Sequence, residues 1–481
     1  MQRRTKIVTT LGPSIDNKES IAELLLAGAN VVRMNFSHGS SEDHLRRAKL
    51  VREVSHELGL HVAILGDLQG PKIRIAKFKN NVITLQPQQP FVLDNKLPQN
   101  EGNENRVGID YKNLPQDCKK GDQLLLDDGR IALEVTEISE HEIMTQVLVG
   151  GELSNNKGIN LKGGGLSAPA LTEKDKQDIL TAVEMDVDYL AISFPRHAQD
   201  ILEAKTLLNQ AGGKAGIVAK IERAEIVQSS KILDEVIQAS EAVMVARGDL
   251  GVEIGDAELI GVQKRIISRA RALDKIVITA TQMMESMITS PIPTRAEVFD
   301  VANAVLDGTD AVMLSAETAT GSHPVLVVEA MSRVCLGAEK EKSALVSSHR
   351  MNIEFKRMDE SIAMSTMYIA NHLKGIKAII SLTESGSTAL WMSRISSGIP
   401  IYALTRREDT QRRVALYRGV EAIQFDPTQL ARNEVNKLAV EALYKRGLVN
   451  NDDLVILTKG DHMGLDGGTN AMKILKVGHI I

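Results

Sequence analysis

The chain has 481 residues, of which 43% are hydrophobic and 25% are charged, and its formal net charge is −5. This length predicts about three domains with apolar cores, and the composition excludes a disordered chain. The slightly negative charge disfavours nucleic acid and anionic membranes as partners, and no apolar run approaches the length of a membrane span. The two cysteines, Cys118 and Cys335, lack metal-binding or redox spacing. We expect a cytoplasmic protein that acts on small molecules.

Short β-rich runs recur along the chain with helical segments between them. Of the last four runs, each but the final one is followed by a helix-like stretch. The runs cover residues 6–11, 30–36, 62–68, 189–194, 216–222, 242–248, 276–281 and 311–315. Eight β/α units predict an α/β fold with a closed (β/α)₈ TIM barrel, in which active sites lie where the strands end.

The long gap between the third and fourth runs changes character. Residues 70–168 contain several prolines and alternating segments, such as 123–126 and 131–138. They predict an inserted, β-barrel-like lid domain. Gly70-Pro71 at its start and the three glycines at 163–165 near its end suit two hinges.

Beyond the barrel, a fresh series of β and α segments predicts an open α/β domain, with strands near 378–382, 401–404 and 454–457. Thr172 and Asp175 have the spacing of a capping box that restarts a barrel helix after the lid. The expected domains are the barrel at 1–69 and 169–345, the lid at 70–168, and the C-terminal domain at 346–481.

A cation and a carboxylate lie two residues apart at the end of one predicted barrel strand. Lys220 and Glu222 follow the apolar run 216–218 and project from one face of the strand. Such groups are unfavourable to bury unless they hold a metal or an anionic substrate. The alternative is an ion pair that plugs the end of the barrel.

The second predicted strand also ends in polar side chains that share a face. Arg33 can grip a phosphate with two hydrogen bonds, while Asn35 and Ser37 offer uncharged oxygens that suit a hard cation. Asp67, at the end of the third strand, adds a carboxylate to the same rim. An ordinary polar strand end is the alternative interpretation.

Glu222 and Asp249 are expected at the ends of neighbouring strands, close enough for their carboxylates to bind one Mg²⁺. Lys220 beside that metal could neutralise charge on a phosphoryl group in transfer. Gly248 and Thr281 face the same barrel mouth and could hold a small carboxylate.

A further hydroxyl and carboxyl follow the last predicted strand. Ser315 and Glu317 could deliver a proton through water.

In the last domain, a strand is joined to a helix by a loop rich in hydroxyl groups. Free backbone N–H groups there would point at an anion, which suggests a phosphorylated effector. The loop lacks the Gly-Lys-Ser/Thr of a nucleotide P-loop, and a plain helix cap is the alternative. Its residues are Thr383, Glu384, Ser385, Gly386, Ser387 and Thr388.

Several motifs occur in the order typical of one enzyme family. They are Arg-Met-Asn-Phe-Ser-His-Gly at 33–39, Gly-Pro-Lys-Ile-Arg at 70–74, Ala-Lys-Ile-Glu-Arg at 219–223, and the segments 246–251, 280–287, 293–300 and 313–319. Through them the chain resembles pyruvate kinases over essentially its whole length. The resemblance implies a barrel with a β lid and an effector domain, usually as a homotetramer, and transfer of phosphate from phosphoenolpyruvate to ADP, giving ATP and pyruvate.

The resemblance also implies a role for each matching residue. Mg²⁺ (or Mn²⁺) would bind Glu222 and Asp249, Lys220 would stabilise the phosphoryl group, and Arg33 would hold the phosphate. The pyruvyl group would meet Gly248, Asp249 and Thr281; the nucleotide would meet Asn35, Phe36, Ser37, His38, Arg74 and Lys157; K⁺ would meet Asn35, Ser37, Asp67 and the carbonyl of Leu68; and Ser315 and Glu317 would form the proton relay.

Three positions depart from the family pattern. Leu68 stands where many members have Thr, and Ala316 where many have Gly. Lys72 replaces the Glu of potassium-dependent relatives, and its ammonium could occupy the place of the cation. We therefore expect weak or absent dependence on K⁺. The loop 383–388 resembles that of the branch activated by AMP and sugar monophosphates rather than by fructose 1,6-bisphosphate.

Two other functions fit parts of the sequence. A Mg²⁺-dependent lyase or aldolase acting on pyruvate enolates could use Glu222 and Asp249, but it would not need a nucleotide lid with Arg74 and Lys157 at its edges. A non-catalytic sensor of phosphorylated metabolites would not need Lys220.

Overall fold

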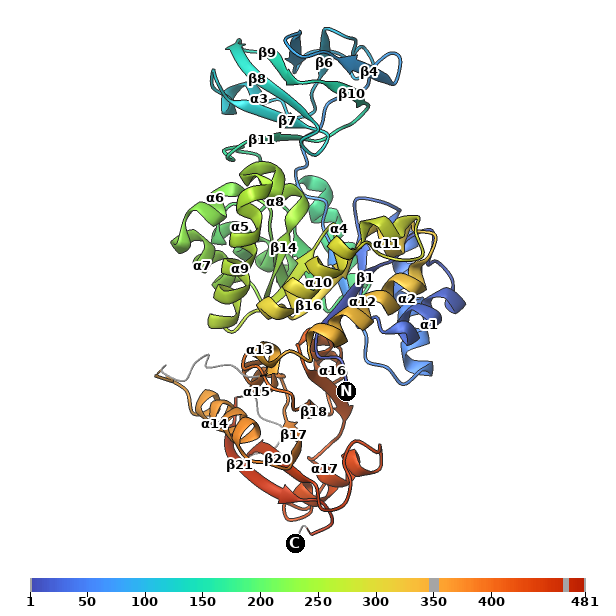
Figure 1. Ribbon diagram of the computed structural model, residues 1–481, viewed down its shortest axis with the longest axis vertical. Helices are drawn as coiled ribbons and strands as arrows, with labels where there is room; N and C mark the ends of the chain where they lie inside the picture. Colours follow the sequence, from blue (N-terminus) through green and yellow to red (C-terminus); the bar gives the residue numbers. More distant parts are fainter. Residues whose placement is uncertain (1, 346–353, 462–466, 480–481) are drawn as a thin grey trace.

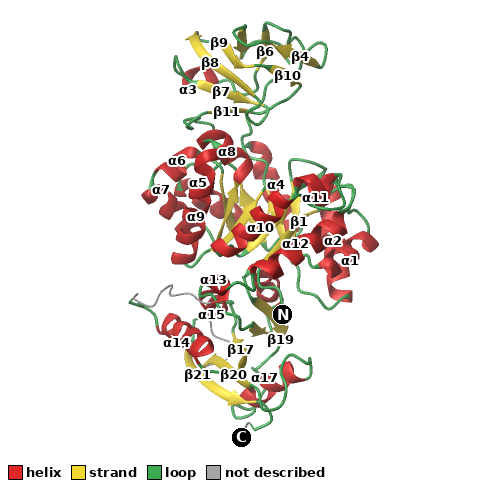
Figure 2. Cartoon of the chain, viewed as in Figure 1, coloured by secondary structure: helices red, strands yellow, loops and turns green. Residues whose placement is uncertain are grey.

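The computed structural model describes residues 2–345, 354–461 and 467–479. Three parts follow one another along the longest axis of the molecule (Figure 1). The barrel lies in the middle, the inserted β sheets lie beyond one end, and the C-terminal sheet lies beyond the other. Figure 2 shows that helices surround the central strands, whereas the inserted part is almost entirely strands and loops.

Eight parallel strands close into the central barrel: β1 (Lys6–Thr10), β2 (Val31–Asn35), β3 (Ala63–Asp67), β12 (Tyr189–Ile192), β13 (Gly216–Ile221), β14 (Ala242–Ala246), β15 (Ile276–Ala280) and β16 (Ala311–Leu314). They are hydrogen-bonded in the order β1-β16-β15-β14-β13-β12-β3-β2. Almost every residue in them is buried, as expected for a parallel sheet covered on its outer face by helices. The predicted barrel is confirmed.

The helices around the barrel are α1 (Lys18–Ala27), α2 (Ser41–Glu57), α4 (Glu173–Glu184), α5 (Ala198–Gln210), α6 (Ala224–Gln228), α7 (Ser230–Ala239), α8 (Arg247–Ile254), α9 (Asp256–Ala272), η1 (Glu285–Ile288), α10 (Arg295–Asp307), α11 (Ala316–Ala319) and α12 (Pro324–Ala338). The short helix α13 (Lys342–Leu345) lies below the barrel, next to the C-terminal part (Figure 1). The Thr172–Asp175 capping box at the start of α4 is confirmed.

The expectation that the last barrel strand lacks a following helix was wrong. α11 and α12 both follow β16, and α12 packs between α1 and α10. Its sequence is apolar on most sides, which hides the helical period, but Val327, Val328 and Met331 are fully buried. Pro324 stands in its first turn, where a missing N–H does no harm.

The insertion contains a two-stranded sheet of β4 (Val82–Leu85) and β10 (Gly151–Ser154). Its larger sheet has the order β11-β7-β8-β9-β5-β6, built from β5 (Pro90–Asp94), β6 (Arg106–Gly108), β7 (Gln123–Leu126), β8 (Ile131–Ile138), β9 (Glu142–Val149) and β11 (Ile159–Leu161), and α3 (Leu114–Asp117) lies between β6 and β7. This part has its own apolar cluster, separate from the barrel's. The expected alternating segments 123–126 and 131–138 are β7 and β8.

The glycines at the predicted hinges have left-handed backbone conformations. Gly70 has a φ of 67°, and Gly163, Gly164 and Gly165 have φ of 86°, 82° and 110°. A side chain at Gly164 would also collide with Glu225, because an added Cβ would lie 2.5 Å from the Oε2 atom. Only glycine suits both demands.

The C-terminal part is an open α/β sheet with the strand order β19-β18-β17-β20-β21. Only β21 is antiparallel to its neighbour. Its elements are α14 (Met358–His372), β17 (Ile376–Leu382), α15 (Ser387–Ser393), β18 (Ile401–Thr405), α16 (Glu408–Arg413), η2 (Val414–Leu416), β19 (Val420–Gln424), α17 (Val435–Tyr444), β20 (Leu454–Gly460) and β21 (Thr469–Lys476). The predicted fold class is confirmed, while the domain boundaries stay predictions, and the one at residue 346 lies outside the described residues.

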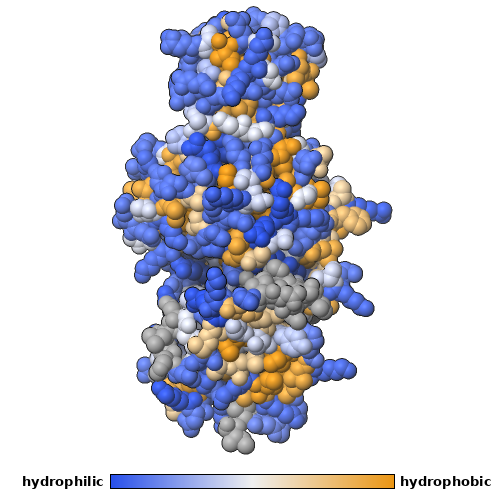
Figure 3. Space-filling view, turned by 90° about the vertical axis from the view of Figure 1, so that its left-hand side faces the viewer, coloured by the Kyte–Doolittle hydropathy of each residue, from blue (hydrophilic) through white to orange (hydrophobic). Residues whose placement is uncertain are grey.

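Within the described ranges, no helix is both long and apolar enough to cross a membrane. On the face in Figure 3, apolar residues form scattered patches among polar ones rather than a continuous band.

Candidate active site

A cavity of about 210 Å³ opens where the barrel strands end, and it gathers most of the residues singled out from the sequence. The predicted site residues that line it are Arg33, Asn35, Ser37, His38, Asp67, Leu68, Lys72, Arg74, Lys220, Glu222, Asp249, Thr281 and Ser315. They come from strands β2, β3 and β13, from helix α8, from the turns after β2, β3, β13, β15 and β16, and from the start of the insertion. The parallel barrel therefore brings together side chains that are almost 300 residues apart in sequence.

Arg33 is fixed at the side of this cavity by two neighbours. Its Nε donates to Asp67 Oδ2 at 2.6 Å and its Nη1 donates to Thr10 Oγ1 at 3.0 Å. Burial would raise the pKa of Asp67, but Lys220 and Arg33 outweigh it and lower that pKa. Asp67 is therefore a carboxylate, and it holds the guanidinium in place at the cavity wall.

Lys220 contacts two of the buried carboxylates at the cavity and one hydroxyl group. Its Nζ donates to Ser193 Oγ at 2.8 Å and lies 3.0 Å from Glu222 Oε1 and 3.4 Å from Asp67 Oδ1. Burial alone would lower the pKa of Lys220, but the carboxylates of Asp67 and Glu222 outweigh it and raise that pKa. The ammonium is therefore held charged inside the barrel mouth.

Glu222 and Asp249 are close enough to repel each other, although Asp249 does not end a strand as expected. β14 ends at Ala246, and Asp249 lies in the first turn of α8, which begins directly after the strand. Burial, with a further contribution from Asp249, raises the pKa of Glu222 against the opposing effect of Lys220. Glu222 Oε2 accepts a hydrogen bond from the Phe194 N–H at 2.7 Å.

Lys72 reaches the cavity from the insertion. Its Nζ lies 3.4 Å from Asp249 Oδ1, so the ammonium faces the acidic pair of Glu222 and Asp249. Asp67 Oδ1 is buried and, among the described residues, has no hydrogen-bond partner. The carbonyl of Leu68, expected at a cation, accepts a hydrogen bond from Ser193 Oγ at 2.7 Å.

Thr281 lines the cavity, while Gly248, outside its lining, lies directly behind Thr281. Thr281 has a φ of 66°, which is strained for a β-branched residue. Its Oγ1 accepts from the Gly248 N–H at 2.8 Å, and its carbonyl accepts from Arg247 Nη2 at 2.7 Å. Arg247 is itself held by Asp300 with two hydrogen bonds of 2.6 and 2.8 Å. The strained turn is thus fixed by a buried guanidinium.

Ser315 and Glu317 meet, but not through the serine hydroxyl. Glu317 Oε2 accepts from the backbone N–H of Ser315 at 2.6 Å, and burial raises the pKa of this carboxyl. A carboxyl whose pKa is raised can hold a proton for transfer at a higher pH than an exposed one.

The residues expected on the nucleotide side are less closely grouped. Asn35 Oδ1 accepts from the Ser37 N–H at 3.1 Å, and Phe36 is buried with its carbonyl bonded to Lys174 Nζ. Lys157 lies outside the described lining of the cavity and contacts Asp127 Oδ1 at 2.7 Å within the insertion. Arg74 lines the cavity edge.

Two polar side chains at the cavity, Ser193 and Gln69, were not predicted from the sequence. Ser193 bridges Lys220 and the Leu68 carbonyl, and Gln69 lines the cavity beside them. Ser193 lies at the end of a predicted barrel strand, and this position was the one available signal for it.

The donor set fits a divalent metal that takes few protein ligands. Across the part of the chain that the structure describes, no cluster of three or more His, Cys, Asp or Glu side chains has metal-binding geometry. Glu222 and Asp249 both line the cavity, so two carboxylates are available there. Mg²⁺ commonly binds one or two carboxylates and takes its remaining ligands from substrate and water.

A second cavity lies in the C-terminal part, at the loop predicted to bind an effector. Thr383, Glu384, Ser385, Ser387 and Thr388 line it, and Gly386 takes the N-cap position of α15 with a φ of 82°. Thr388 Oγ1 is hydrogen-bonded to Thr469 Oγ1 at 2.8 Å. We call this cavity the α15 pocket.

Comparison with known proteins agrees with this geometry along the whole chain. The family model described as "Pyruvate kinase, barrel domain" matches residues 2–328, and the one described as "Pyruvate kinase, alpha/beta domain" matches residues 360–475. The chain belongs to the pyruvate kinase family. Members transfer phosphate from phosphoenolpyruvate to ADP, and this Mg²⁺-dependent step is the last of glycolysis.

Several bacterial pyruvate kinases are similar to the chain over nearly their full length. "Pyruvate kinase" of Buchnera aphidicola subsp. Schizaphis graminum is 59% identical over 475 residues, which cover 99% of this chain and 98% of the relative. "Pyruvate kinase II" of Salmonella typhimurium is 59% identical over 478 residues, 99% of both chains. "Pyruvate kinase" of Haemophilus influenzae is 58% identical over 459 residues, 95% of this chain and 96% of the relative.

Proposed function

We propose that the cavity at the barrel mouth carries out the phosphoryl transfer of this pyruvate kinase, with Lys220 as its central catalytic residue. The observation that carries the proposal is the position of the Lys220 ammonium, 3.0 Å from Glu222 and 3.4 Å from Asp67, in a cavity that Arg33 also lines. Two fixed cations beside a pair of carboxylates suit a phosphate that passes between two oxygens.

In this proposal each residue has one task. Arg33 holds the phosphate of phosphoenolpyruvate, and Lys220 neutralises the charge that spreads over the phosphoryl oxygens. The P–O bond to the enolate oxygen breaks while a bond to a terminal oxygen of ADP forms. The Gly248 N–H and the Thr281 hydroxyl, now bonded to each other, hold the carboxylate of the substrate.

The enolate left behind takes a proton at its terminal carbon, which gives pyruvate. Ser315 and Glu317 form the relay that delivers this proton through water, and the raised pKa of Glu317 suits a donor. Asn35, Phe36, Ser37 and His38, with Arg74 and Lys157 of the insertion, form the nucleotide side.

Glu222 and Asp249 would hold the divalent metal, Mg²⁺ or Mn²⁺. When bound, it supplies positive charge that polarises the substrate oxygens. Replacing Glu222 with Gln should weaken Mn²⁺ binding by at least about 10-fold, since a metal-bound carboxylate is lost. Titration followed by electron paramagnetic resonance measures this without turnover. Unchanged Mn²⁺ affinity would contradict the assignment.

Activity without K⁺ is the second part of the proposal. Pyruvate kinases use K⁺ as well as a divalent metal, but here Lys72 brings a fixed ammonium into the cavity beside Asp249. Asn35, Ser37, Asp67 and the Leu68 carbonyl are the ligands that K⁺ would otherwise use. Turnover of phosphoenolpyruvate, ADP and Mg²⁺ in Na⁺ salts should match that in K⁺ salts. A large loss when a bulky organic cation replaces K⁺ would refute this.

The α15 pocket is the proposed site of a phosphorylated effector of the AMP or sugar monophosphate type. Its support is a set of hydroxyl groups at the start of a helix, where the N–H groups of the first turn favour an anion. AMP should bind and lower the KM for phosphoenolpyruvate, and adding a negative charge by Ser387→Asp should abolish that response. An equal response in the variant would reject this site.

Cytoplasmic location and assembly as a homotetramer complete the proposal, since both are usual for this family. Sedimentation of the purified protein decides the second point.

A further inference from the structure

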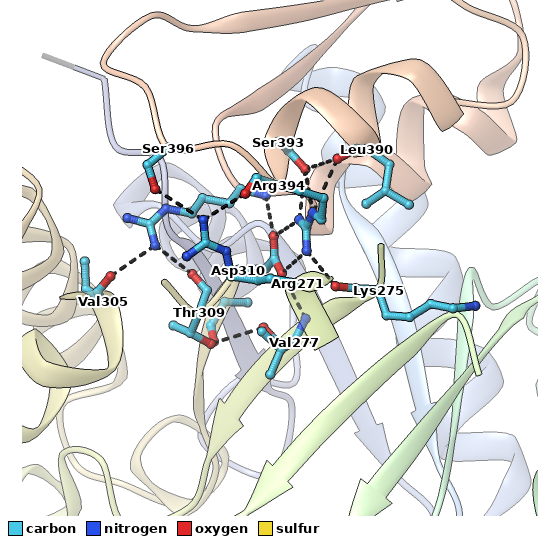
Figure 4. Close-up of polar contacts among 12 residues, drawn as sticks. Arg271, Lys275, Val277, Val305, Thr309, Asp310, Leu390, Ser393, Arg394 and Ser396 are labelled. Carbon is cyan, nitrogen blue, oxygen red and sulfur yellow. Dashed lines mark hydrogen bonds and ion pairs between the residues drawn. The ribbon is translucent and has the colours of Figure 1, made fainter. Parts of the chain in front are cut away.

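A buried ion pair joins the C-terminal part to the base of the barrel, at the end opposite the active site. Arg394 and Asp310 are each 1% exposed. Arg394 Nη1 donates to Asp310 Oδ2 at 2.9 Å, and Arg394 Nη2 donates to Asp310 Oδ1. Figure 4 shows the Arg394 side chain extending from the end of α15 to Asp310 and to the carbonyl of Lys275. The pair lies far from solvent, where its geometry is strictly held.

The arginine is built into the short helix that begins at the α15 pocket. It is the C-cap residue of α15, and its side chain also bonds the Leu390 carbonyl and Ser393 Oγ of the same helix. Thr388, in the first turn, lines the pocket. Arg394 lies six positions after Thr388, a rise of about 9 Å along the helix. Any shift of the helix in response to a ligand therefore moves the guanidinium.

The aspartate is built into the start of two barrel strands that end at the active site. Asp310 directly precedes β16, and its Oδ2 also accepts from the Val277 N–H of β15 at 2.9 Å. β15 is followed by Thr281, and β16 is followed by Ser315. An extended strand from Asp310 to Ser315 spans about 16 Å, and a hydrogen-bonded strand does not stretch easily.

We propose that Arg394 and Asp310 are positioning residues that couple the α15 pocket to the active site. Through the ion pair, the position of α15 sets the alignment of β15 and β16, and with it the placement of Thr281 and Ser315 in the barrel mouth. The inference rests on the proposed function for the roles of those two residues and of the pocket.

Replacing both Arg394 and Asp310 with neutral residues separates a loss of coupling between the two sites from a loss of protein stability. Removing one partner alone leaves a buried charge and destabilises the protein, whereas replacing both is often tolerated. In the double variant Arg394→Met with Asp310→Asn, the asparagine can still accept from the Val277 N–H. The barrel then keeps its hydrogen bond from the Val277 N–H, and Asp310 loses its links to the C-terminal part, from Arg394 and from the Arg418 N–H.

The test follows α15 while a ligand binds at the other end of the barrel. Oxalate, a planar anion with the shape of the pyruvate enolate, is added with Mg²⁺. In the wild type, hydrogen exchange of the amides in α15 should slow by about 5-fold or more, the lower end of usual site-to-site coupling. The single tryptophan, Trp391, lies in α15 and gives a fluorescence signal of the same event.

The double variant should bind Mg²⁺ and oxalate but lose both signals from α15. A full response in the double variant, or none in the wild type, would overturn the proposal. Arg394→Lys offers a second variant that keeps the charge. A lysine cannot bond both oxygens of Asp310 and the Lys275 carbonyl with a planar fork, so a reduced response is expected and an unchanged one counts against the proposal.

Glu241→Gln is the matched control. Glu241 also precedes a barrel strand, β14, and its Oε2 accepts from the Ile217 N–H at 2.8 Å, but its cation partner, Lys205, lies on α5 of the barrel. This variant should keep the α15 response. The readout does not require an effector, so a failure of AMP to bind would reject the effector proposal and still leave the coupling measured.

Discussion

Ion pairs are buried at both ends of the barrel, but Asp310 at the base and Asp67 at the mouth differ in how many hydrogen bonds their carboxylate oxygens accept. At the base, each oxygen of Asp310 accepts two hydrogen bonds, from Arg394 and from the Arg418 or Val277 N–H. At the mouth, Asp67 Oδ1 is buried and has no hydrogen-bond partner among the described residues. Saturated pairs hold parts of a protein together, while incomplete ones are typical of a site that expects a ligand.

The charge balance at the mouth points the same way. Lys220 must serve two carboxylates, Asp67 and Glu222, and the pKa of Glu222 is raised by burial and by Asp249. The unfavourable burial of the Glu222 carboxylate beside Asp249 is relieved when a divalent cation binds there. In the Arg394–Asp310 pair at the base, by contrast, one guanidinium meets one carboxylate.

Removing Lys220 should give the largest effect in the molecule. Lys220→Met should lower kcat by more than about 1,000-fold, because the fixed charge on the transferring phosphoryl group is lost. Steady-state turnover of phosphoenolpyruvate and ADP measures it. Lys205→Met, which removes an ammonium paired with Glu241 on the barrel surface, should leave kcat within about twofold.

The same variant tests whether the barrel mouth is the site of the reaction. Retained turnover in Lys220→Met would show that the mouth is not the site of phosphoryl transfer. Circular dichroism should show a folded barrel in both lysine variants.

Breaking the saturated pair should affect stability rather than chemistry. Arg394→Met should lower the free energy of unfolding by about 3–5 kcal/mol, since Asp310 keeps its charge without a partner. Urea denaturation followed by Trp391 fluorescence measures it. Adding Asp310→Asn should restore part of the loss.

Another bidentate pair provides the control for that measurement. Arg269 bonds Asp234 at 2.8 and 2.6 Å, but both side chains are partly exposed. Arg269→Met should therefore lower the free energy of unfolding by less than about 1 kcal/mol. Equal losses in the two arginine variants would mean that burial does not set the difference.

The sequence predicts the mouth far better than the base. Lys220 and Glu222 alternate along a strand, so their shared face follows from the period of two. Asp249 was placed one element too early, because the Gly248 that permits a tight turn does not reveal where β14 ends and α8 begins. Its position in the cavity was still predicted, since both a strand end and a first helical turn face the mouth.

The pair at the base has no local pattern at all. Arg394 and Asp310 are 84 residues apart and belong to different parts of the fold. Ser193 was missed for a related reason, since a lone serine at a strand end has no distinguishing chemistry until Lys220 and the Leu68 carbonyl are placed beside it. Long-range contacts of this kind depend on how the parts dock, which periodicity does not encode.

Glu253, near the lid hinge, is intermediate between Asp310 and Asp67 in how well its carboxyl group is hydrogen-bonded. This buried carboxyl has one hydrogen-bond donor among the described residues. Its Oε2 accepts from the Ala224 N–H at 2.8 Å, and burial raises its pKa from an ordinary 4.5 to about 8. Between these two values the folded protein binds a proton that the unfolded chain has released. The free energy of unfolding must therefore fall as pH rises from about 4.5 to 8, and level off above.

Glu253→Gln removes this proton linkage and keeps the acceptor for Ala224. Compared with wild type, the variant should gain about 2–3 kcal/mol of relative stability between pH 6 and pH 9, because one pKa unit corresponds to about 1.4 kcal/mol. Thermal midpoints of both proteins across this range measure the difference. Glu253→Asp keeps a titrating carboxyl and should retain the wild-type slope. Parallel pH profiles for wild type and Glu253→Gln would mean that Glu253 is charged in the fold and that Arg223 nearby stabilises it more than burial opposes it.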